Sequence, residues 1–444
     1  PLEFLRRSGP STFAFSSPLV SEVILDALPA EARGEMHAAA AAACEEAIGD
    51  GDIEQPDRIA LHLYEAGERD RAAGYFARSA QRNLLGGNYD GAARETIRAL
   101  ELCDLTRHPA AELGAWLSQL ATAVYRVRVA REVPNLMEQL LAQMDKTGNL
   151  RTRVTARIDV ANILVSIHEL EAADRYLVAA KELAGDEKHL VRLAVLTEAE
   201  LARRRGDYVR ALERFEEAAK LGNEDAATAH RTLMGLALAY AASGAEERAH
   251  ATLESAEKFA DPDDIALRCE RAKLDQLIAF FSRDFPGAID AGQKAVEIAR
   301  QAGLAYEVAI NLHLLGEALF RNEELPRAYA CFQQSSALCD EIAAERLRAH
   351  NGSFLAYLDA TTDFDGACET LRESIEYAHT PNYSWDEVNA RYLLAKLFQQ
   401  KEQVDEARAE FERCRDLAQS VGLRLMDDDC KNALAQLGES GASA

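Results

Sequence analysis

The side chains that most often carry chemistry are scattered along this sequence. Its ten histidines stand at positions 37, 62, 108, 168, 189, 230, 250, 313, 350 and 379. No two of them are four residues apart, the spacing that puts two imidazoles on one helix face for a metal ion. Acidic runs such as Glu213, Glu216 and Glu217 have Arg and Lys nearby, which is typical of a solvated helix face. We therefore expect no locally built metal site, no cofactor and no paired catalytic carboxylates.

The short motifs that position a nucleophile, a zinc ion or a nucleotide phosphate are also missing. GxSxG, HExxH, GxGxxG and GxxxxGK[ST] do not occur in the 444 residues. Gly86-Gly87 indicates a turn between helices, because no strand precedes it. We predict that the chain is not an enzyme, and we keep an enzyme with a site built from distant segments as a third hypothesis behind the two given below.

The eight cysteines show no metal-ligand spacing. They are Cys44, Cys103, Cys269, Cys331, Cys339, Cys368, Cys414 and Cys430, and no two form CxxC. Several fall within amphipathic helix patterns. We interpret them as small buried hydrophobic residues of a protein in a reducing cytoplasm.

Composition and charge narrow the classes of partner. Hydrophobic residues make up 48% of the chain, Gly and Pro number only 25 and 11, and no apolar run reaches 18 residues. This balance favours helices packed through small side chains and predicts no membrane-spanning helix. The net charge is −24 and no basic stripe stands out, so we expect no nucleic-acid partner. The acidic surface keeps the protein dissolved or, alternatively, meets a basic partner.

Those helices are predicted from a repeat whose clearest copy is Gly206–Ala218. Gly206, Ala211, Phe215 and Ala218 follow one another at intervals of five, four and three residues. The glycine allows a turn, the alanines allow two helix backbones to cross closely, and the aromatic ring fills the space beside them.

The same register recurs nine times. The crossing position is filled by Ala92, Val133, Ala173, Ala211, Ala249, Ala288, Ala328, Ala367 and Ala407. The turn position holds Gly87, Arg128, His168, Gly206, Gly244, Arg283, Glu323, Thr362 and Glu402. Each first helix should carry a large-small-aromatic signature, of which Leu312, Leu315-Gly316 and Leu319 form the best case. Successive units are 38 to 41 residues apart, so each is a helical hairpin that must stack on its neighbours to bury its apolar face.

The repeat resembles a long form of the tetratricopeptide (TPR) motif. The resemblance implies an all-α fold, a right-handed TPR-type helical-hairpin solenoid. We expect five segments: a winged-helix-like remnant over 1–29, linking helices and an atypical first hairpin over 30–85, the repeats over 86–422, a capping helix over 423–437 and a disordered tail over 438–444.

The N-terminal segment resembles a junction in bacterial signalling ATPases of the STAND type, where a winged-helix piece runs into TPR repeats. The matching residues are Phe13, Phe15, Leu19, Val20, Glu22, Leu28, Pro29, Arg33, Met36, His37, His62, Ala66, Gly67 and Ala72. Ser17 departs from the family, which usually has His there. The resemblance covers roughly residues 10–105. It implies that an ATPase module, with or without a kinase or cyclase module, precedes Pro1; the N-terminus, PLEFLRRSGP, likewise has no initiator Met and no apolar signal core.

Candidate binding residues follow from the TPR resemblance, because the first helix of each unit lines the concave groove of such a superhelix. Counting back from the turn residues gives Tyr125, Asn162, Glu200, Arg203, Arg231, Met234, Lys273, Phe280, His313, Glu317, Phe320, Tyr392 and Lys396. No two adjacent units supply the Lys-Asn-Asn-Lys-Arg set of chaperone adaptors, so we expect no chaperone clamp.

The groove mixes apolar and isolated charged side chains, which suits a peptide segment of a partner protein or a small inducer. We predict a non-catalytic, ligand-sensing and protein-interaction arm of a larger bacterial signalling protein, without nucleic acid or membrane as partner. The alternative is a free-standing TPR scaffold that assembles complexes without sensing a ligand.

Overall fold

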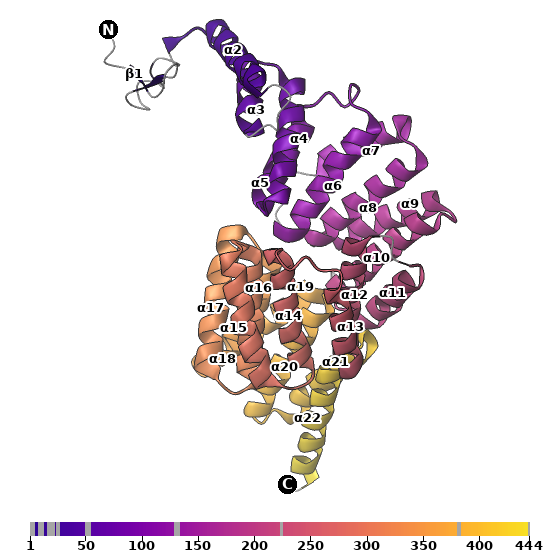
Figure 1. Ribbon diagram of the computed structural model, residues 1–444. Coiled ribbons are helices and arrows are strands. Elements are labelled where there is room, and N and C mark those ends of the chain that lie inside the picture. Colours follow the sequence, from indigo (N-terminus) through magenta and orange to yellow (C-terminus); the bar gives the residue numbers. More distant parts are fainter. Residues whose placement is uncertain are drawn as a thin grey trace. The chain divides into compact units, whose positions relative to one another are not determined.

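Antiparallel helix pairs build almost all of the described chain (Figure 1). The computed structural model describes residues 5–7, 13–15, 23, 27–48, 55–127, 134–222, 225–379 and 383–442. The chain divides into two units, residues 1–120 with 132–147 and residues 121–131 with 148–444. The prediction of an all-α TPR-type solenoid is confirmed.

The first unit holds a short hairpin and the first helices. Its elements are β1 (Leu5–Arg7), β2 (Phe13–Phe15), α2 (Ala30–Ile48), α3 (Pro56–Glu65), α4 (Arg69–Leu85), α5 (Tyr89–Leu102), most of α6 (Ala110–Val127) and α7 (Pro134–Thr147). The strands pair antiparallel, with Leu5 opposite Phe15. The expected strand at Phe13 and Phe15 is therefore present, whereas the helix expected from Pro18 lies largely outside the described residues. The winged-helix remnant stays a prediction.

The second unit contains, in its described residues, seven helical hairpins and a last helix. Its helices are α8 (Leu150–Ser166), α9 (Leu170–Ala184), α10 (Lys188–Arg205), α11 (Tyr208–Lys220), α12 (Ala226–Ala242), α13 (Glu246–Glu257), α14 (Ile265–Phe281), α15 (Phe285–Gln301), α16 (Ala305–Arg321), α17 (Leu325–Ile342), α18 (Glu345–Asp359), α19 (Phe364–His379), α20 (Ser384–Gln400), α21 (Val404–Val421) and α22 (Arg424–Ala442). The last helix continues through residues 438–442, where we expected a disordered tail.

The turn inside most hairpins has a left-handed backbone. The turn residues with positive φ are Gly87, His168, Gly206, Gly244, Arg283, Glu323 and Glu402, with φ between 59° and 81°. Such values suit glycine, and a residue with a Cβ adopts them at a cost. The turn geometry thus recurs even where the residue type does not.

The small and aromatic positions of the repeat are buried as predicted. Ala211, Phe215 and Ala218 of α11 are at most 1% exposed. Every described residue at the equivalent positions of the other units is buried too, except the half-buried Ser374. Val133 and Arg128 lie outside the described residues. Each second helix therefore presents an apolar ridge to the helices on both sides.

First helices meet these ridges with small residues. The ring of Phe332 lies 2.7 Å from the point where a Cβ on Gly316 would stand. The same ring stacks on Phe354 with centroids 4.6 Å apart. Gly316 therefore leaves the space that the aromatic ring of its own hairpin fills.

The second unit also makes contacts between helices far apart in sequence. α11 packs against α21. Asp429 of α22 forms ion pairs with Arg283 at 2.6 Å and Arg321 at 2.5 Å. The hydroxyl of Tyr383 donates to the carbonyl oxygen of His168 at 3.1 Å. The last two hairpins and α22 thus rest on the turns of earlier repeats, and we call these the closing contacts.

Two further expectations concern membranes and cysteines. None of the helices in the described ranges combines the length and apolarity needed to cross a membrane. Cys269, Cys339, Cys368, Cys414 and Cys430 are buried thiols, while the other three cysteines are half-buried.

Replacing Gly316 by Ala should destabilise the protein by about 1–3 kcal/mol, because the added methyl group overlaps the Phe332 ring. Gly352→Ala is the matched control. Gly352 also lies inside a helix, but a Cβ there meets nothing within 4 Å, so this variant should gain about 0.5–1 kcal/mol of helix propensity. Thermal or urea unfolding of both variants checks the difference, and equal effects would contradict the assigned packing.

Candidate functional site

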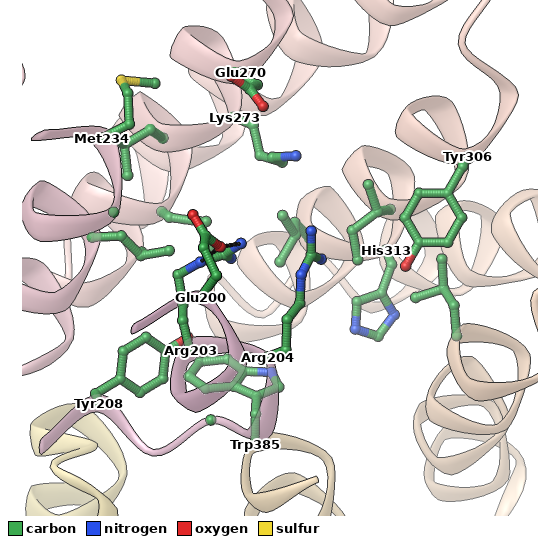
Figure 2. A pocket seen from close by; sticks show the side chains of 18 of the residues that line it. Glu200, Arg203, Arg204, Tyr208, Met234, Glu270, Lys273, Tyr306, His313 and Trp385 are labelled. Carbon is green, nitrogen blue, oxygen red and sulfur yellow. Dashed lines mark hydrogen bonds and ion pairs between the residues drawn. The ribbon is translucent and has the colours of Figure 1, made fainter. Parts of the chain in front are cut away.

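One pocket of the second unit gathers side chains from α6, α10, α11, α12, α14, α16, α18 and α20 (Figure 2). Its volume is about 190 Å³. Its basic residues are Arg203, Arg204, Arg231, Lys273 and Arg346, its acidic residues are Glu200, Glu270 and Asp386, its histidines are His313 and His350, and its aromatic residues are Tyr125, Tyr208, Phe281, Tyr306 and Trp385. We call this the central pocket.

A buried carboxylate anchors one side of the central pocket. Glu200 is 3% exposed and its Oε2 accepts hydrogen bonds from Arg203 Nη2 at 2.6 Å and Nε at 3.0 Å. Burial alone would raise the pKa of Glu200, but the guanidinium groups of Arg203 and Arg231 lower it to about 2. The carboxylate is therefore ionised throughout the physiological range and fixes the Arg203 side chain.

Arg231 extends this cluster toward Tyr125. Its Nη2 donates to Asn162 Oδ1 at 2.8 Å, and its guanidinium lies 5.4 Å from the centre of the Tyr125 ring. Its Nε is buried and makes no hydrogen bond within the described chain; Glu200 Oε1 is 3.7 Å away. Burial, followed by the charges of Glu270 and Glu200, raises the pKa of Tyr125 to about 12, so its hydroxyl stays protonated.

Two further ion pairs hold the other basic side chains. Arg346 donates from Nε and Nη2 to the two oxygens of Asp386 at 2.8 and 2.9 Å, a bidentate pair. Lys273 Nζ lies 2.6 Å from Glu307 Oε2, behind the pocket surface. These ion pairs fix the positions of Arg346 and Lys273, and both side chains still line the pocket.

An aromatic wall closes the pocket beside the α10–α11 turn. Trp385 packs edge-on against Phe281 at 5.4 Å, and Tyr208 does so at 6.2 Å. Gly206 permits this approach, because a Cβ there would stand 2.8 Å from the Trp385 backbone nitrogen. Figure 2 shows Tyr208 and Trp385 on one side of the pocket and Met234, Glu270 and Lys273 on the other.

Two buried histidines form the remaining end. The rings of His313 and His350 are 4.3 Å apart between centroids. His313 Nε2 lies 2.9 Å from Glu317 Oε1, on the same face of α16. Burial, followed by the electrostatic influence of the neighbouring His313 ring, lowers the pKa of His350 well below its ordinary value, so this imidazole is neutral.

Seven of the thirteen candidate residues named from the sequence line this pocket. They are Tyr125, Glu200, Arg203, Arg231, Met234, Lys273 and His313. Asn162 and Glu317 lie just behind them, bonded to Arg231 and His313.

The other four candidates lie elsewhere. Phe280 is buried, edge-on to Phe281. Phe320 packs on Phe354 and Tyr357. Tyr392 and Lys396 of α20 lie near Arg321, which reaches α22. None of these four residues lines the central pocket.

Sequence counting overlooked several lining residues. Asp386 lies in the first turn of α20, six residues before Tyr392, the first candidate residue of that helix. Arg346 lies likewise in the first turn of α18. None of the counted positions falls in the first turn of a helix, so the count missed both. Tyr208 and Trp385 enter through the contact between distant repeats, and no local pattern marks them.

The balance of charge in the pocket differs from that of the chain. The lining carries five basic and three acidic side chains, whereas the chain has a net charge of −24. Glu307, which lies behind the lining, forms an ion pair with one of these basic residues, Lys273. The lining is therefore richer in basic side chains than the chain as a whole.

Comparison with known proteins supports the fold through structure alone. Neither a protein-family profile nor a curated protein sequence matches this chain. A Rap protein complexed with competence and sporulation factor superposes with a TM-score of 0.53 at 12% identity, covering 76% of this chain and 99% of its own. A STAND protein with a tetratricopeptide repeat sensor from Pyrococcus horikoshii gives 0.46 at 13% identity, covering 96% and 68%. Aspartyl phosphate phosphatase F from Bacillus subtilis gives 0.48 at 12%, covering 78% and 94%.

Glu200→Gln should flatten the dependence of stability on acid pH. The folded pKa of Glu200, about 2, lies below the ordinary value of 4.5. Its ionisation therefore stabilises the fold above pH 4.5, and this contribution disappears as the pH falls toward 2. The melting temperature of the wild type should fall faster over this interval than that of the variant. Glu213→Gln, an exposed glutamate of α11, should behave as the wild type; equal slopes for all three proteins would contradict the buried ion pair.

Proposed function

We propose that this chain is the ligand-sensing and protein-interaction arm of a larger signalling protein, and that the central pocket receives the ligand. The observation that carries the proposal is a pocket with an excess of basic side chains, enclosed by repeats distant in the sequence. No chemistry takes place in the chain under this proposal; binding changes its conformation.

The pocket's size and charge favour a small ligand with an anionic group. A volume of about 190 Å³ is below the roughly 300–1,000 Å³ of drug-sized sites, and an α-helix is about 10–12 Å across. A partner helix would therefore need the pocket to open. A small carboxylate or phosphate could reach Arg231, whose side chain belongs to the pocket lining. The ring of Trp385 offers a flat apolar surface elsewhere in the lining.

The closing contacts suggest how ligand binding would change the conformation of the chain. The lining spans α6 to α20, so a ligand that contacts both α10 and α20 favours the arrangement in which the Trp385 region rests on the Gly206 turn. A ligand shifts such an equilibrium by the difference between its affinities for the closed and open arrangements. The arm would report ligand as a change in the fraction of closed molecules.

The larger protein is inferred from the sequence resemblance of the N-terminal segment. A STAND-type ATPase module before Pro1 would read the arm's state, and the whole would act in the bacterial cytoplasm. The Rap protein in the structural comparison is complexed with competence and sporulation factor, which is a precedent for ligand recognition by this fold. A peptide or protein segment therefore stays open as the second kind of ligand.

Screening the purified chain by thermal shift tests the proposal. The probes are nucleotides, sugar phosphates and dicarboxylates, each with an uncharged analogue, and a pool of short synthetic peptides. At least one anionic probe should raise the melting temperature, because ligands of the folded state stabilise it. Arg231→Gln should weaken the best probe by about 10- to 100-fold, the loss of a charge-assisted hydrogen bond.

Arg268→Gln serves as the control, since Arg268 is exposed and lies outside the pocket lining. It should leave the affinity unchanged. Binding of uncharged analogues as tightly as the anions, or equal affinity in the Arg231→Gln protein, would reject the pocket assignment. Stabilisation by no probe at all would favour the scaffold alternative.

If the chain senses its ligand by closing, a closing contact far from the pocket should affect the apparent affinity for the ligand. Asp429→Asn should weaken the ion pairs to Arg283 and Arg321 and lower the apparent affinity of the best probe without touching the pocket. Asp428→Asn removes the neighbouring carboxylate, which pairs with Arg424 within α22, and should leave the affinity unchanged. Isothermal titration measures both; equal affinities would separate closure from binding and contradict the sensing mechanism.

A further inference from the structure

Three potential metal ligands converge at the histidine end of the central pocket. Atoms of His313, Glu317 and His350 that could hold a metal ion lie within 4.8 Å of one another. His313 Nε2 is 2.9 Å and His350 Nε2 is 3.7 Å from Glu317 Oε1. In a tetrahedral site with bonds of about 2.0–2.1 Å, ligand atoms are roughly 3.4 Å apart. The two separations from Glu317 Oε1 lie on either side of that value.

The hydrogen bonds around His313 direct its Nε2 toward this point. Ser335 Oγ donates to the carbonyl oxygen of Ala309 at 2.8 Å, and it accepts from Asn351 Nδ2 at 2.8 Å. The amide oxygen of Asn351 consequently faces His313 Nδ1, also at 2.8 Å. The Nδ1 proton of His313 is therefore held by Asn351, which leaves Nε2 as the atom available to a cation.

His350 is oriented in the same sense from another helix. Its Nδ1 lies 3.5 Å from Asp386 Oδ1, a carboxylate that can only accept a proton. Its Nε2 lies 3.3 Å from the amide nitrogen of Asn389, a donor, and so carries a lone pair. Both imidazoles thus keep a proton on Nδ1 and turn Nε2 toward Glu317, as metal-binding histidines do when a second group holds the other nitrogen.

Glu317 completes the set as an anion. It is 2% exposed, and Trp385 Nε1 and Asn389 Nδ2 donate to its Oε1 at 3.4 Å each. These two donors are too distant for strong hydrogen bonds, so the carboxylate keeps acceptor capacity. A divalent cation would take the place of the proton between Glu317 and His313.

We propose that His313, Glu317 and His350 form a zinc site, with a fourth coordination position that opens into the central pocket. Two imidazoles and one carboxylate suit zinc, and an open set of three protein ligands is typical of sites that bind a further ligand. Both histidines line the pocket, so that further ligand would be water or an anionic group bound there. Asp386 and Asn351 act as positioning residues. The inference does not depend on the proposed sensing function, because it can be tested with the metal alone.

The experiment uses the full chain, stripped with a chelator and titrated with Zn²⁺ in competition with a chromophoric chelator. One Zn²⁺ should bind per chain, and Co²⁺ in its place should give the visible absorption of tetrahedral cobalt. Glu317→Gln and His350→Gln should each weaken Zn²⁺ binding by at least about 100-fold, and Asp386→Asn by about 10- to 100-fold. Circular dichroism checks that each variant is folded.

His250→Gln is the matched control. His250 stands four residues from Glu246, as His313 does from Glu317, but that pair is exposed and lies at 3.9 Å. Its loss should leave Zn²⁺ affinity unchanged. If the wild type binds no stoichiometric Zn²⁺, or the Glu317→Gln protein binds it equally well, the cluster is a hydrogen-bonded ion pair and the proposal is overturned. Nitrogen-15 spectra of the wild-type histidine rings decide the matter if the variants do not fold, because coordination must shift two Nε2 resonances.

Discussion

The close packing of helix backbones at small residues is the constraint on which the rest of this structure depends. In each of the seven described hairpins of the second unit an alanine lies where two helices meet, and in all but one, where Gly292 stands, a larger side chain fills the space beside it. Such packing tolerates little change in volume, since protein interiors are as dense as organic crystals. Repeated along the second unit, it fixes the position of each first helix and hence the direction of its inward side chains.

The central pocket shows how such a scaffold can hold charges that a single helix could not. Glu200, Asp386 and Glu317 are largely buried, and each has partners on its own helix or on a neighbour. An isolated buried charge is costly, whereas a paired and hydrogen-bonded one is tolerated. Because Arg231, Arg346 and His350 approach these carboxylates from other hairpins, the full charge pattern exists only when the hairpins are stacked. A site of this kind therefore forms only when several repeats are stacked together.

The sequence predicts the repeats well and the site only in part, for physical reasons. Small positions such as Ala211 follow from a local spacing that recurs nine times. Trp385 could not be placed, because it reaches the Gly206 turn through the superhelical path, which small rotations between successive hairpins set. His350 was overlooked for a related reason, since it meets Glu317 of α16 only through the packing of the fold. Burial distinguishes this cluster from exposed pairs of histidine and glutamate, and burial comes only with the fold.

The left-handed turns have a consequence for how this chain can change over evolutionary time. At His168 and Arg283 a residue with a Cβ adopts a conformation that glycine would adopt more easily, a difference of about 1–2 kcal/mol. Arg283 reaches Asp429 from that turn, and the carbonyl oxygen of His168 receives Tyr383. Each of these two strained turns therefore also makes an ion pair or a hydrogen bond to a distant repeat. A lineage that exchanged Arg283 for glycine would relieve the strain at this turn and lose the ion pair that joins the middle of the array to its last helix. Selection for local stability and selection for this long-range contact would therefore act in opposite directions at the same residue.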